Sequence, residues 1–324
     1  ISKEFLYDLA VAGDKVFLRM NGMQVYDLNT GANIYTAAFD YTPDKLVGAP
    51  AGAKKFGVYH AVADPVIVGD DLYVVDMSNK KTQYVKKYDK NSGKLLWTSP
   101  EIKEARAIPA MYVVGDRVLL QIGGNVEAQA YIYKREPDGQ GGWRITEEWR
   151  IWHPNVKPNG IQAFSTADGS LAWESERFRK GITNAVVVGD QFIVCSGKEL
   201  YSMDIATGVE KYAVPVSKGG LGLADQIMVY KDMIVVIGDR GVSTFNSRTG
   251  EPVAMGKYKK SDLEDFEGDR MILKTAKADI ACFDLDDCSF KEFKARTGAI
   301  TSMSTDGNFV YVYEKKNVTK VGTR

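Results

Sequence analysis

The chain has 324 residues, a length that two average domains or one all-β repeat domain can fill. Hydrophobic residues make up 44% and charged residues 26%, and 42 Lys and Arg balance 42 Asp and Glu, as in an ordinary globular protein. This balance argues against nucleic acid as the main partner, because phosphate binding depends on concentrated positive charge. No apolar run approaches the ~18 residues that a membrane span needs.

Pairs of apolar stretches separated by a Gly-Asp turn recur along the whole chain. Each stretch is rich in β-branched and aromatic residues, and the residues between the stretches tolerate a positive φ, which is typical of a tight β-hairpin. In chain order the turns lie at Gly13, Gly69, Gly115, Gly189, Lys231, Gly268 and Asp306. The sequence therefore predicts seven hairpins.

A second turn follows each hairpin except the last. Its Asp or Asn can accept hydrogen bonds from the turn amides, and its closing Gly supplies the left-handed conformation that the next strand needs. The copies read YDLNTGANIY (26–35), YDKNSGKLLW (88–97), FSTADGSLAW (164–173), MDIATGVEKY (203–212), FNSRTGEPVA (245–254) and FDLDDCSFKE (283–292). Five of the six keep the glycine, and Cys288 replaces it in the sixth.

These two turns define a repeat of four strands, which we call A to D. The later copies are spaced 37 to 42 residues apart, the length of a four-stranded propeller blade. Helical periodicity is weak, which disfavours a parallel α/β fold. The sequence predicts a single all-β propeller domain over residues 1–324, with seven four-stranded blades. Eight blades stay open, because residues 36–64 could hold a degenerate one.

The pattern V-V-x-G-D-x-x-Y-V, then L-Y-x-x-D-x-x-T-G-x-x-x-W, resembles the repeat of pyrroloquinoline quinone (PQQ) dehydrogenases and of the BamB-type propeller lipoproteins of outer-membrane assembly. The resemblance covers nearly the whole chain and specifies the fold far more than the activity, because its residues are turn formers and core residues. In that family a Trp late in strand D docks between blades, and only Trp97 and Trp173 stand at this position here. The other matching positions hold Tyr35, Tyr212, Ala254 and Glu292. The resemblance implies a looser joint between blades five and six.

The two ends of the chain are expected to meet in the last blade. The last repeat shows strands A to C but no strand D, so residues 2–6 are expected to supply it and close the ring, which leaves no free sheet edge. The chain begins at Ile1 without a methionine, which is compatible with the loss of a signal peptide or lipid-anchor segment.

Two insertions mark the side of the propeller that carries the B–C and D–A loops, where loop length varies and binding groups are expected. The first, at about 40–60, is rich in Gly, Ala and Pro, is expected to be a long ordered loop and ends at His60. The second, at about 125–159, is expected to form an extra hairpin. We interpret its aromatic residues as a stacking platform for a protein or carbohydrate ligand, with packing against the propeller as the alternative. The residues concerned are Trp143, Trp149, Trp152 and His153.

The mouth of the central channel is the other candidate site. Near the start of each innermost strand the repeats place the residues Asp8, Asp64, Ala110, Asn184, Gln226, Leu263 and Thr301. Several are polar where the following residues are apolar, which solvation of a strand end explains, with a polar ring that faces a ligand or ordered water as the alternative. For an enzyme, Asp64 or Asp225 would be the candidate general base.

Signals of catalysis or metal binding are weak. Three cysteines without a C-x-x-C spacing and two distant histidines argue against a zinc site, so we expect no metal. Cys282 and Cys288 flank a turn and could bridge in an oxidising compartment or stay as reduced, half-buried thiols, whereas Cys195 is expected in the core. No P-loop, G-x-S-x-G or H-E-x-x-H motif is present, and no catalytic residue is assigned.

The resemblance and these weak signals together predict a non-catalytic scaffold in the bacterial cell envelope. PQQ-binding relatives typically have a longer chain, eight Trp-rich blades and adjacent cysteines, so no cofactor is expected here. We expect a protein or other extended ligand on the long-loop side and a location in the periplasm or at the cell surface. The alternative is a PQQ- and calcium-dependent oxidoreductase, or a sugar-active enzyme, that uses the channel mouth.

Overall fold

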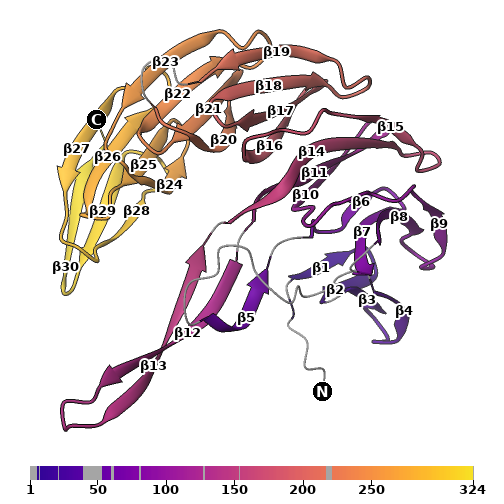
Figure 1. Ribbon diagram of the computed structural model, residues 1–324, viewed down its shortest axis with the longest axis horizontal. Coiled ribbons are helices and arrows are strands. Elements are labelled where there is room, and N and C mark those ends of the chain that lie inside the picture. Colours follow the sequence, from indigo (N-terminus) through magenta and orange to yellow (C-terminus); the bar gives the residue numbers. More distant parts are fainter. Residues whose placement is uncertain are drawn as a thin grey trace. The chain divides into compact units, whose positions relative to one another are not determined.

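The computed structural model describes residues 6, 8–20, 22–38, 53–59, 62–79, 82–126, 128–152, 154–216 and 221–323, with the backbone alone for 38, 53–59, 78–79, 128–134 and 147–152. The chain divides into two compact units, which are described separately. Unit 1 comprises residues 1–182 and 205–208, and unit 2 comprises residues 183–204 and 209–324. The regular elements in the described ranges are all β-strands (Figure 1), and none of these ranges holds a helix suited to crossing a bilayer.

Unit 1 contains the first three repeats, each folded as a four-stranded antiparallel sheet that we call a blade. Blade 1 is formed by β1 (Asp8–Ala12), β2 (Lys15–Arg19), β3 (Gly22–Asp27) and β4 (Asn33–Ala38). Blade 2 is formed by β6 (Val66–Val68), β7 (Asp71–Asn79), β8 (Thr82–Asp89) and β9 (Leu95–Thr98). Blade 3 is formed by β10 (Ala110–Val114), β11 (Arg117–Asn125), β14 (Asn155–Ser165) and β15 (Leu171–Glu174).

Unit 2 contains the remaining repeats, called blades 4 to 7. Blade 4 is formed by β16 (Ile182–Val188), β17 (Gln191–Ser196), β18 (Glu199–Asp204) and β19 (Glu210–Pro215), and blade 5 by β20 (Ala224–Tyr230), β21 (Met233–Gly238), β22 (Gly241–Asn246) and β23 (Pro252–Lys257). Blade 6 is formed by β24 (Asp262–Glu267), β25 (Arg270–Lys274), β26 (Asp279–Asp284) and β27 (Phe290–Lys294), and blade 7 by β28 (Ile300–Met303), β29 (Phe309–Glu314) and β30 (Asn317–Gly322).

The predicted all-β propeller blades are thus present, and the described residues form only three strands of blade 7. Residues 2–5, proposed as part of its fourth strand, lie outside the described residues, whereas Leu6 is described and exposed. Closure into a seven-bladed ring as a single domain stays a prediction.

The A–B turns follow the sequence pattern closely. In blade 1 the register pairs Ala12 with Lys15, which leaves Gly13 and Asp14 as a two-residue turn with Gly13 at φ 63°. A positive φ at the first turn residue suits glycine because it has no Cβ. Lys231 adopts the same conformation with φ 53°. In blade 7 the connection is longer and the positive φ falls on Gly307, next to the predicted Asp306.

The C–D turns also match their predicted chemistry. In blade 1 Oδ1 of Asp27 accepts hydrogen bonds from the backbone N–H groups of Asn29, at 3.0 Å, and Thr30, at 2.8 Å. All six turns close on a residue with positive φ, including Cys288 at 56°. The five glycines are Gly31, Gly93, Gly169, Gly208 and Gly250. The turn therefore holds a left-handed residue even where glycine is replaced.

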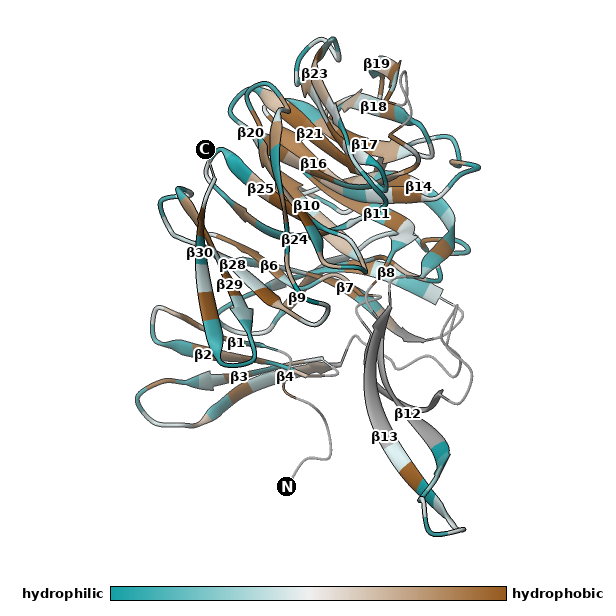
Figure 2. Cartoon of the chain, turned by 90° about the vertical axis from the view of Figure 1, so that its left-hand side faces the viewer, coloured by the Kyte–Doolittle hydropathy of each residue, from teal (hydrophilic) through white to brown (hydrophobic). Residues whose placement is uncertain are grey.

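The core lies between successive blades of each unit. Every residue of the B strands β17 and β21 is buried, and Figure 2 shows hydrophobic colour concentrated on such inner strands, with hydrophilic colour at turns. In unit 1 Val75 of blade 2 packs in one cluster with Leu120 and Phe164 of blade 3. In unit 2 Val235 of blade 5 and Phe283 of blade 6 share another. Burial of these side chains holds neighbouring blades together.

The two insertions meet in one sheet, which the sequence did not predict. The second insertion forms the expected hairpin, β12 (Ala128–Pro137) paired with β13 (Trp143–Trp152). The first, expected to be a loop, contributes β5 (Ala53–Tyr59), which pairs antiparallel with β12. The loop expectation is therefore wrong for residues 53–59. The missed signal is the run AKKFGVY, whose backbone hydrogen bonds are satisfied by a strand distant in sequence.

The three cysteines are buried free thiols. Cys282 packs in an apolar cluster with blade 7, whereas Cys288 packs in a cluster with blade 5. The bridge between them that the sequence left open does not form, because the two side chains belong to different inter-blade clusters. Cys195 is in the core of blade 4, as expected.

Candidate functional site

Each blade has two ends with different connections. The strand order places the A–B and C–D turns at one end, which we call the turn side, and the B–C and D–A connections at the other, which we call the loop side. The turns are short and similar from blade to blade, whereas both insertions belong to loop-side connections. Candidate sites on a rigid β-scaffold are expected among the variable loops.

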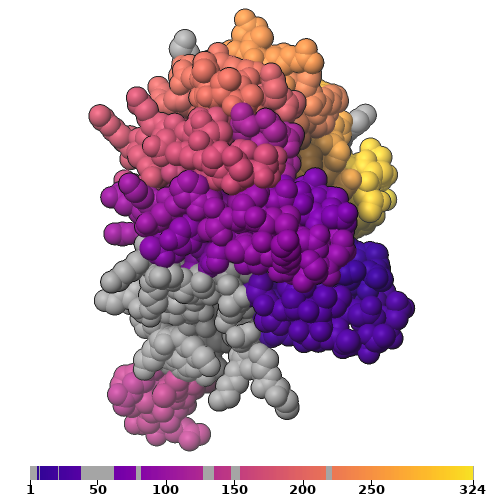
Figure 3. Space-filling model, turned by 90° about the vertical axis from the view of Figure 1, so that its right-hand side faces the viewer, coloured from indigo at the N-terminus to yellow at the C-terminus, as the bar shows by residue number. Residues whose placement is uncertain are grey.

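The hairpin β12–β13 exposes apolar residues at its tip. Trp143 is 59% exposed and Ile145 is 72% exposed, and the tip is visible in Figure 3 as a pink lobe apart from the purple surface of blades 2 and 3. The guanidinium carbon of Arg135 lies 4.9 Å from the centre of the Trp143 ring. Packing against the propeller, the alternative weighed for this face, does not hold for these two residues.

The other aromatic candidates of the hairpin are only partly described. The backbone of Trp149 pairs with Tyr131 and that of Trp152 pairs with Ala128, so both lie in the regular part of β13. Their side chains, and both His60 and His153, lie outside the described residues. The aromatic platform, Trp143 included, therefore stays a prediction.

The candidates of the channel mouth divide between the two units: Asp64 precedes β6, whereas Asn184 lies in β16 and Asp225 in β20. In unit 1 the exposed Asp64 carboxylate lies 3.9 Å from Nε of the buried Arg19. In unit 2 Asp225 is an exposed residue of β20. A continuous polar ring stays a prediction.

Asn184 is a structural clamp between blades 4 and 5. Its Nδ2 donates to the backbone oxygen of Ile227 at 2.8 Å, and its Oδ1 accepts from the N–H of Ile227 at 2.9 Å. The side-chain amide thus forms one hydrogen bond through its nitrogen and one through its oxygen, both with the backbone of Ile227 in the neighbouring blade. This side chain therefore joins strands β16 and β20. The expected ligand role has to compete with these two hydrogen bonds.

A cationic hollow on the loop side of unit 1 was not anticipated from the sequence. It has a volume of about 720 Å³ and lies between blades 2 and 3. Four cationic side chains line it, Arg106, Lys157, Arg177 and Arg179, together with the single carboxylate of Glu104. We call this site the cationic hollow. Guanidinium groups bind carboxylates and phosphates with paired, charge-assisted hydrogen bonds, so the chemistry of this lining suits an anion.

Hydrogen bonds hold the loops that carry these cations. The backbone N–H of Phe178 donates to the oxygen of Asn159 at 3.0 Å, and Nδ2 of Asn159 donates to the oxygen of Lys180 at 2.9 Å. Oδ1 of the buried Asn159 accepts from the N–H of Gly124 at 2.8 Å. The strand β14 and the connection after β15 are thereby fixed to each other, which positions the cations on both.

The sequence contained a usable signal for this site. The basic residues cluster in the two D–A connections that follow the docking Trp97 and Trp173, in KEARA (103–107) and ERFRKG (176–181). The net charge of zero concealed this local excess, because acidic residues elsewhere balance it. A charge count made blade by blade on the loop side would have found it.

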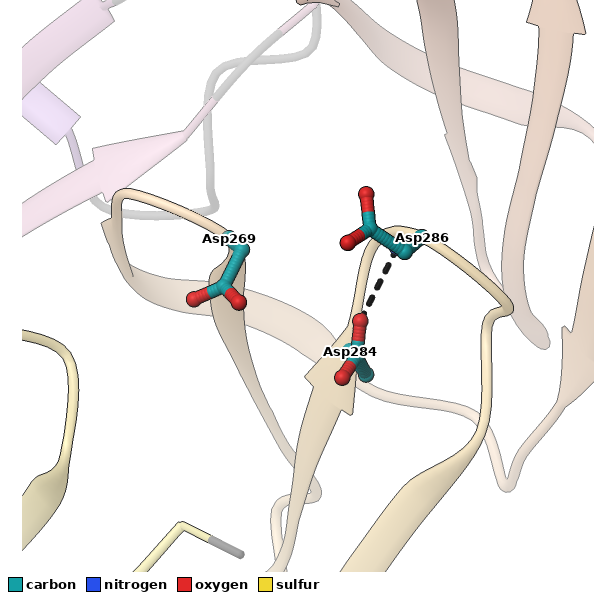
Figure 4. A group of neighbouring side chains, drawn as sticks. All are labelled: Asp269, Asp284 and Asp286. Atoms are coloured by element: carbon teal, nitrogen blue, oxygen red, sulfur yellow. Dashed lines mark hydrogen bonds between the residues drawn. The ribbon is translucent and has the colours of Figure 1, made fainter.

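Three carboxylates come together on the turn side of blade 6, and they are accounted for by ion pairs. Asp269, Asp284 and Asp286 lie side by side (Figure 4). Asp284 pairs with the buried Arg270, and Nζ of Lys231 lies 2.6 Å from Asp286. The hydrogen bond from Lys231 lowers the pKa of Asp286. Two cations already offset two of the three negative charges of this group, which weakens its attraction for a metal ion.

Comparison with known proteins identifies the family. The family described as outer membrane protein assembly factor BamB matches residues 2–143 and 157–289. Among solved structures, BamB from Moraxella catarrhalis is 15% identical, with a TM-score of 0.50 over 95% of this chain and 79% of that chain. The C-terminal WD40 domain of Sif2 is 11% identical, with a TM-score of 0.53 over 100% of this chain and 82% of that one. No curated protein sequence matches the chain. The two structures show the propeller fold, and by its family match the chain belongs to the BamB family.

Proposed function

We propose that this protein is a non-catalytic scaffold of the bacterial cell envelope that binds a protein partner through its loop side. Family membership supports the scaffold role and the envelope location, since the family is named for outer-membrane protein assembly. The observation that carries the choice of side is structural. The exposed hairpin tip and the cationic hollow both lie on loop-side connections of blade 3 or of its junction with blade 2.

A protein fits these features better than a small ligand. The hairpin tip presents Trp143 and Ile145 on an extended strand, and exposed aromatic and aliphatic residues of this kind act as anchors in protein interfaces. The family name likewise refers to protein assembly rather than to carbohydrate metabolism. We further propose that the protein is located in the periplasm and held by a lipid anchor. Fractionation of cells that express the full-length gene would test this location.

The PQQ-dependent oxidoreductase is the alternative that a single titration can exclude. Calorimetric titration of the purified chain with PQQ and calcium is expected to give no stoichiometric heat, whereas a known quinoprotein dehydrogenase treated in the same way gives a saturating curve. Stoichiometric binding of PQQ would contradict the scaffold proposal. Variants at Asp64, Asn184 and Asp225 would then show whether the channel mouth holds the cofactor.

A further inference from the structure

The cationic hollow combines a local excess of positive charge with a single carboxylate, that of Glu104, among the described residues that line it. Its four cations and one carboxylate leave a net charge of +3 in a protein whose total charge is zero. None of the four forms an ion pair with another of the described residues. Elsewhere cations commonly have such a partner, as Lys86 has in Asp76 at 2.5 Å and Lys211 has in Asp190 at 2.6 Å.

The cationic hollow is also partly preformed before any ligand binds. Nη2 of Arg177 donates to the backbone oxygen of Lys103 at 3.4 Å, which links the two D–A connections on either side of the hollow. The buried Gln83 and Ala105 also line it, and the half-buried Phe178 supplies an apolar surface beside the cations. A preformed site loses less entropy on binding than one that must fold around its ligand.

From this lining we propose that the cationic hollow binds an acidic polypeptide segment, one with several Asp or Glu side chains. This inference rests on the proposed protein-binding function and names the chemistry of the partner. The described lining contains no glycine-rich turn or helix N-terminus of the kind that typically cradles a phosphate through backbone N–H groups. Its cations come from three separate segments with Phe178 among them, which suits a chain with several carboxylates and apolar stems.

Fluorescence anisotropy with the full chain tests this proposal. The probe is a labelled peptide of alternating Glu and Gly, compared with the same peptide carrying Gln for Glu. We expect the Glu peptide to bind and the Gln peptide not to bind, with affinity falling as NaCl rises from about 50 to about 300 mM, because salt screens exposed charges. Loss of one charge-assisted contact in Arg106→Gln or Arg177→Gln is expected to weaken binding about tenfold.

Arg248→Glu is the matched control for Arg177→Glu, because it makes the same change of charge in an exposed turn-side residue of unit 2. We expect Arg177→Glu to abolish binding and the control to keep it, with thermal unfolding curves to show that both variants fold. If tripolyphosphate binds and the Glu peptide does not displace it, the proposal would be overturned in favour of a small anion. Equal binding of the Glu and Gln peptides, or no binding of either, would overturn it as well.

Failure of the acidic-segment proposal is distinguishable from failure of the proposed scaffold function. If a partner protein crosslinks to the loop side while the Glu peptide does not bind, then the scaffold function stands and the acidic segment is wrong. If neither is observed, then both fail.

Discussion

Gly169 meets two separate requirements that no residue type other than glycine satisfies together. Its φ is 74°, in the left-handed region, and a Cβ at this position would lie 2.5 Å from Cε3 of Trp97 in the preceding blade. The indole also donates through Nε1 to the backbone oxygen of Thr166 at 3.1 Å. The docking tryptophan and the turn glycine therefore form one structural unit across the joint between blades 2 and 3.

The loss of folding stability caused by a Cβ at Gly169 can be compared with that at a turn glycine that contacts no docking aromatic residue. Gly115 has φ 57° but no atom within 4 Å of an added Cβ, so Gly115→Ala is expected to cost only the left-handed strain, about 1 kcal/mol. Gly169→Ala adds a clash with the Trp97 ring and is expected to cost about 2–4 kcal/mol in all. Denaturant unfolding of both variants checks this difference, and equal losses would refute the docking account.

The thiols provide a second test at the residue scale. Burial raises the pKa of Cys282 and of Cys288 to about 11 and raises that of Cys195 further. Because the thiolate is the reactive species, we expect no reaction with Ellman's reagent in the native protein near neutral pH and three thiols after denaturation. A single thiol after denaturation without reductant would show that Cys282 and Cys288 are bridged after all.

At the scale of elements, the five joints from blade 1 to blade 6 follow one rule with one exception. At four joints an aromatic side chain of strand D occupies the space where the next turn glycine would carry a Cβ. The pairs are Tyr35 with Gly93, Trp97 with Gly169, Trp173 with Gly208 and Tyr212 with Gly250. At the joint of blades 5 and 6, Ala254 replaces the aromatic residue and the buried Cys288 replaces the glycine. A small docking residue leaves room for a side chain on the turn.

This joint is filled by other means. Phe283 packs against Phe290 with ring centres 4.7 Å apart, and Tyr258 packs against Phe290 at 5.3 Å. The looser joint that the sequence implied is not evident in the packing and stays a prediction about stability. Hydrogen exchange that is no faster in β24 than in β20 would contradict it.

A double-mutant cycle tests whether the two replacements compensate. Ala254→Trp alone is expected to destabilise the protein, because the indole would compete with Cys288 for the same space. Cys288→Gly removes that conflict, so the double variant is expected to be more stable than the sum of the single effects predicts, by about 1–3 kcal/mol. Additive effects in urea unfolding would show that the positions are independent.

The prediction of elements from the sequence succeeded where local chemistry decides the structure. The turns at Gly13 and Asp27 could be predicted because a positive φ favours glycine and a side-chain acceptor requires a residue such as Asp. Strand β5 was not readable, because its pairing with β12 depends on a segment about seventy residues away. The cationic hollow was missed because its lining comes from separate segments that the fold brings together, although the basic residues at 103–107 and 176–181 were a local signal for it.

For the whole molecule, the aspartates of the turns predict a loss of stability in acid. Hydrogen bonds from Ser304 and Asn308 lower the pKa of Asp306 to about 2, and bonds from Thr30 lower that of Asp27. Each folded-state pKa lies below the unfolded value, so this stabilisation is complete above the unfolded pKa and is lost as the pH falls through the folded pKa.

The Tm is therefore expected to decrease as the pH is lowered from about 4 to about 2, because these carboxylates become protonated. Asp306→Asn keeps an acceptor oxygen without the titration, so this variant is expected to show a smaller decline than the parent over that range. An identical decline in both proteins would mean that Asp306 does not contribute.

Photocrosslinking in living cells can show whether a protein partner binds the loop side. A photoreactive phenylalanine analogue is placed at Ile145 or Arg179 on the loop side of unit 1, and at Asp14 or Asp116 on its turn side, in the full-length protein. We expect a covalent adduct with the same envelope protein from Ile145 and Arg179 and none from Asp14 and Asp116. Adducts confined to the turn-side positions, or no adduct from either loop-side position, would contradict it.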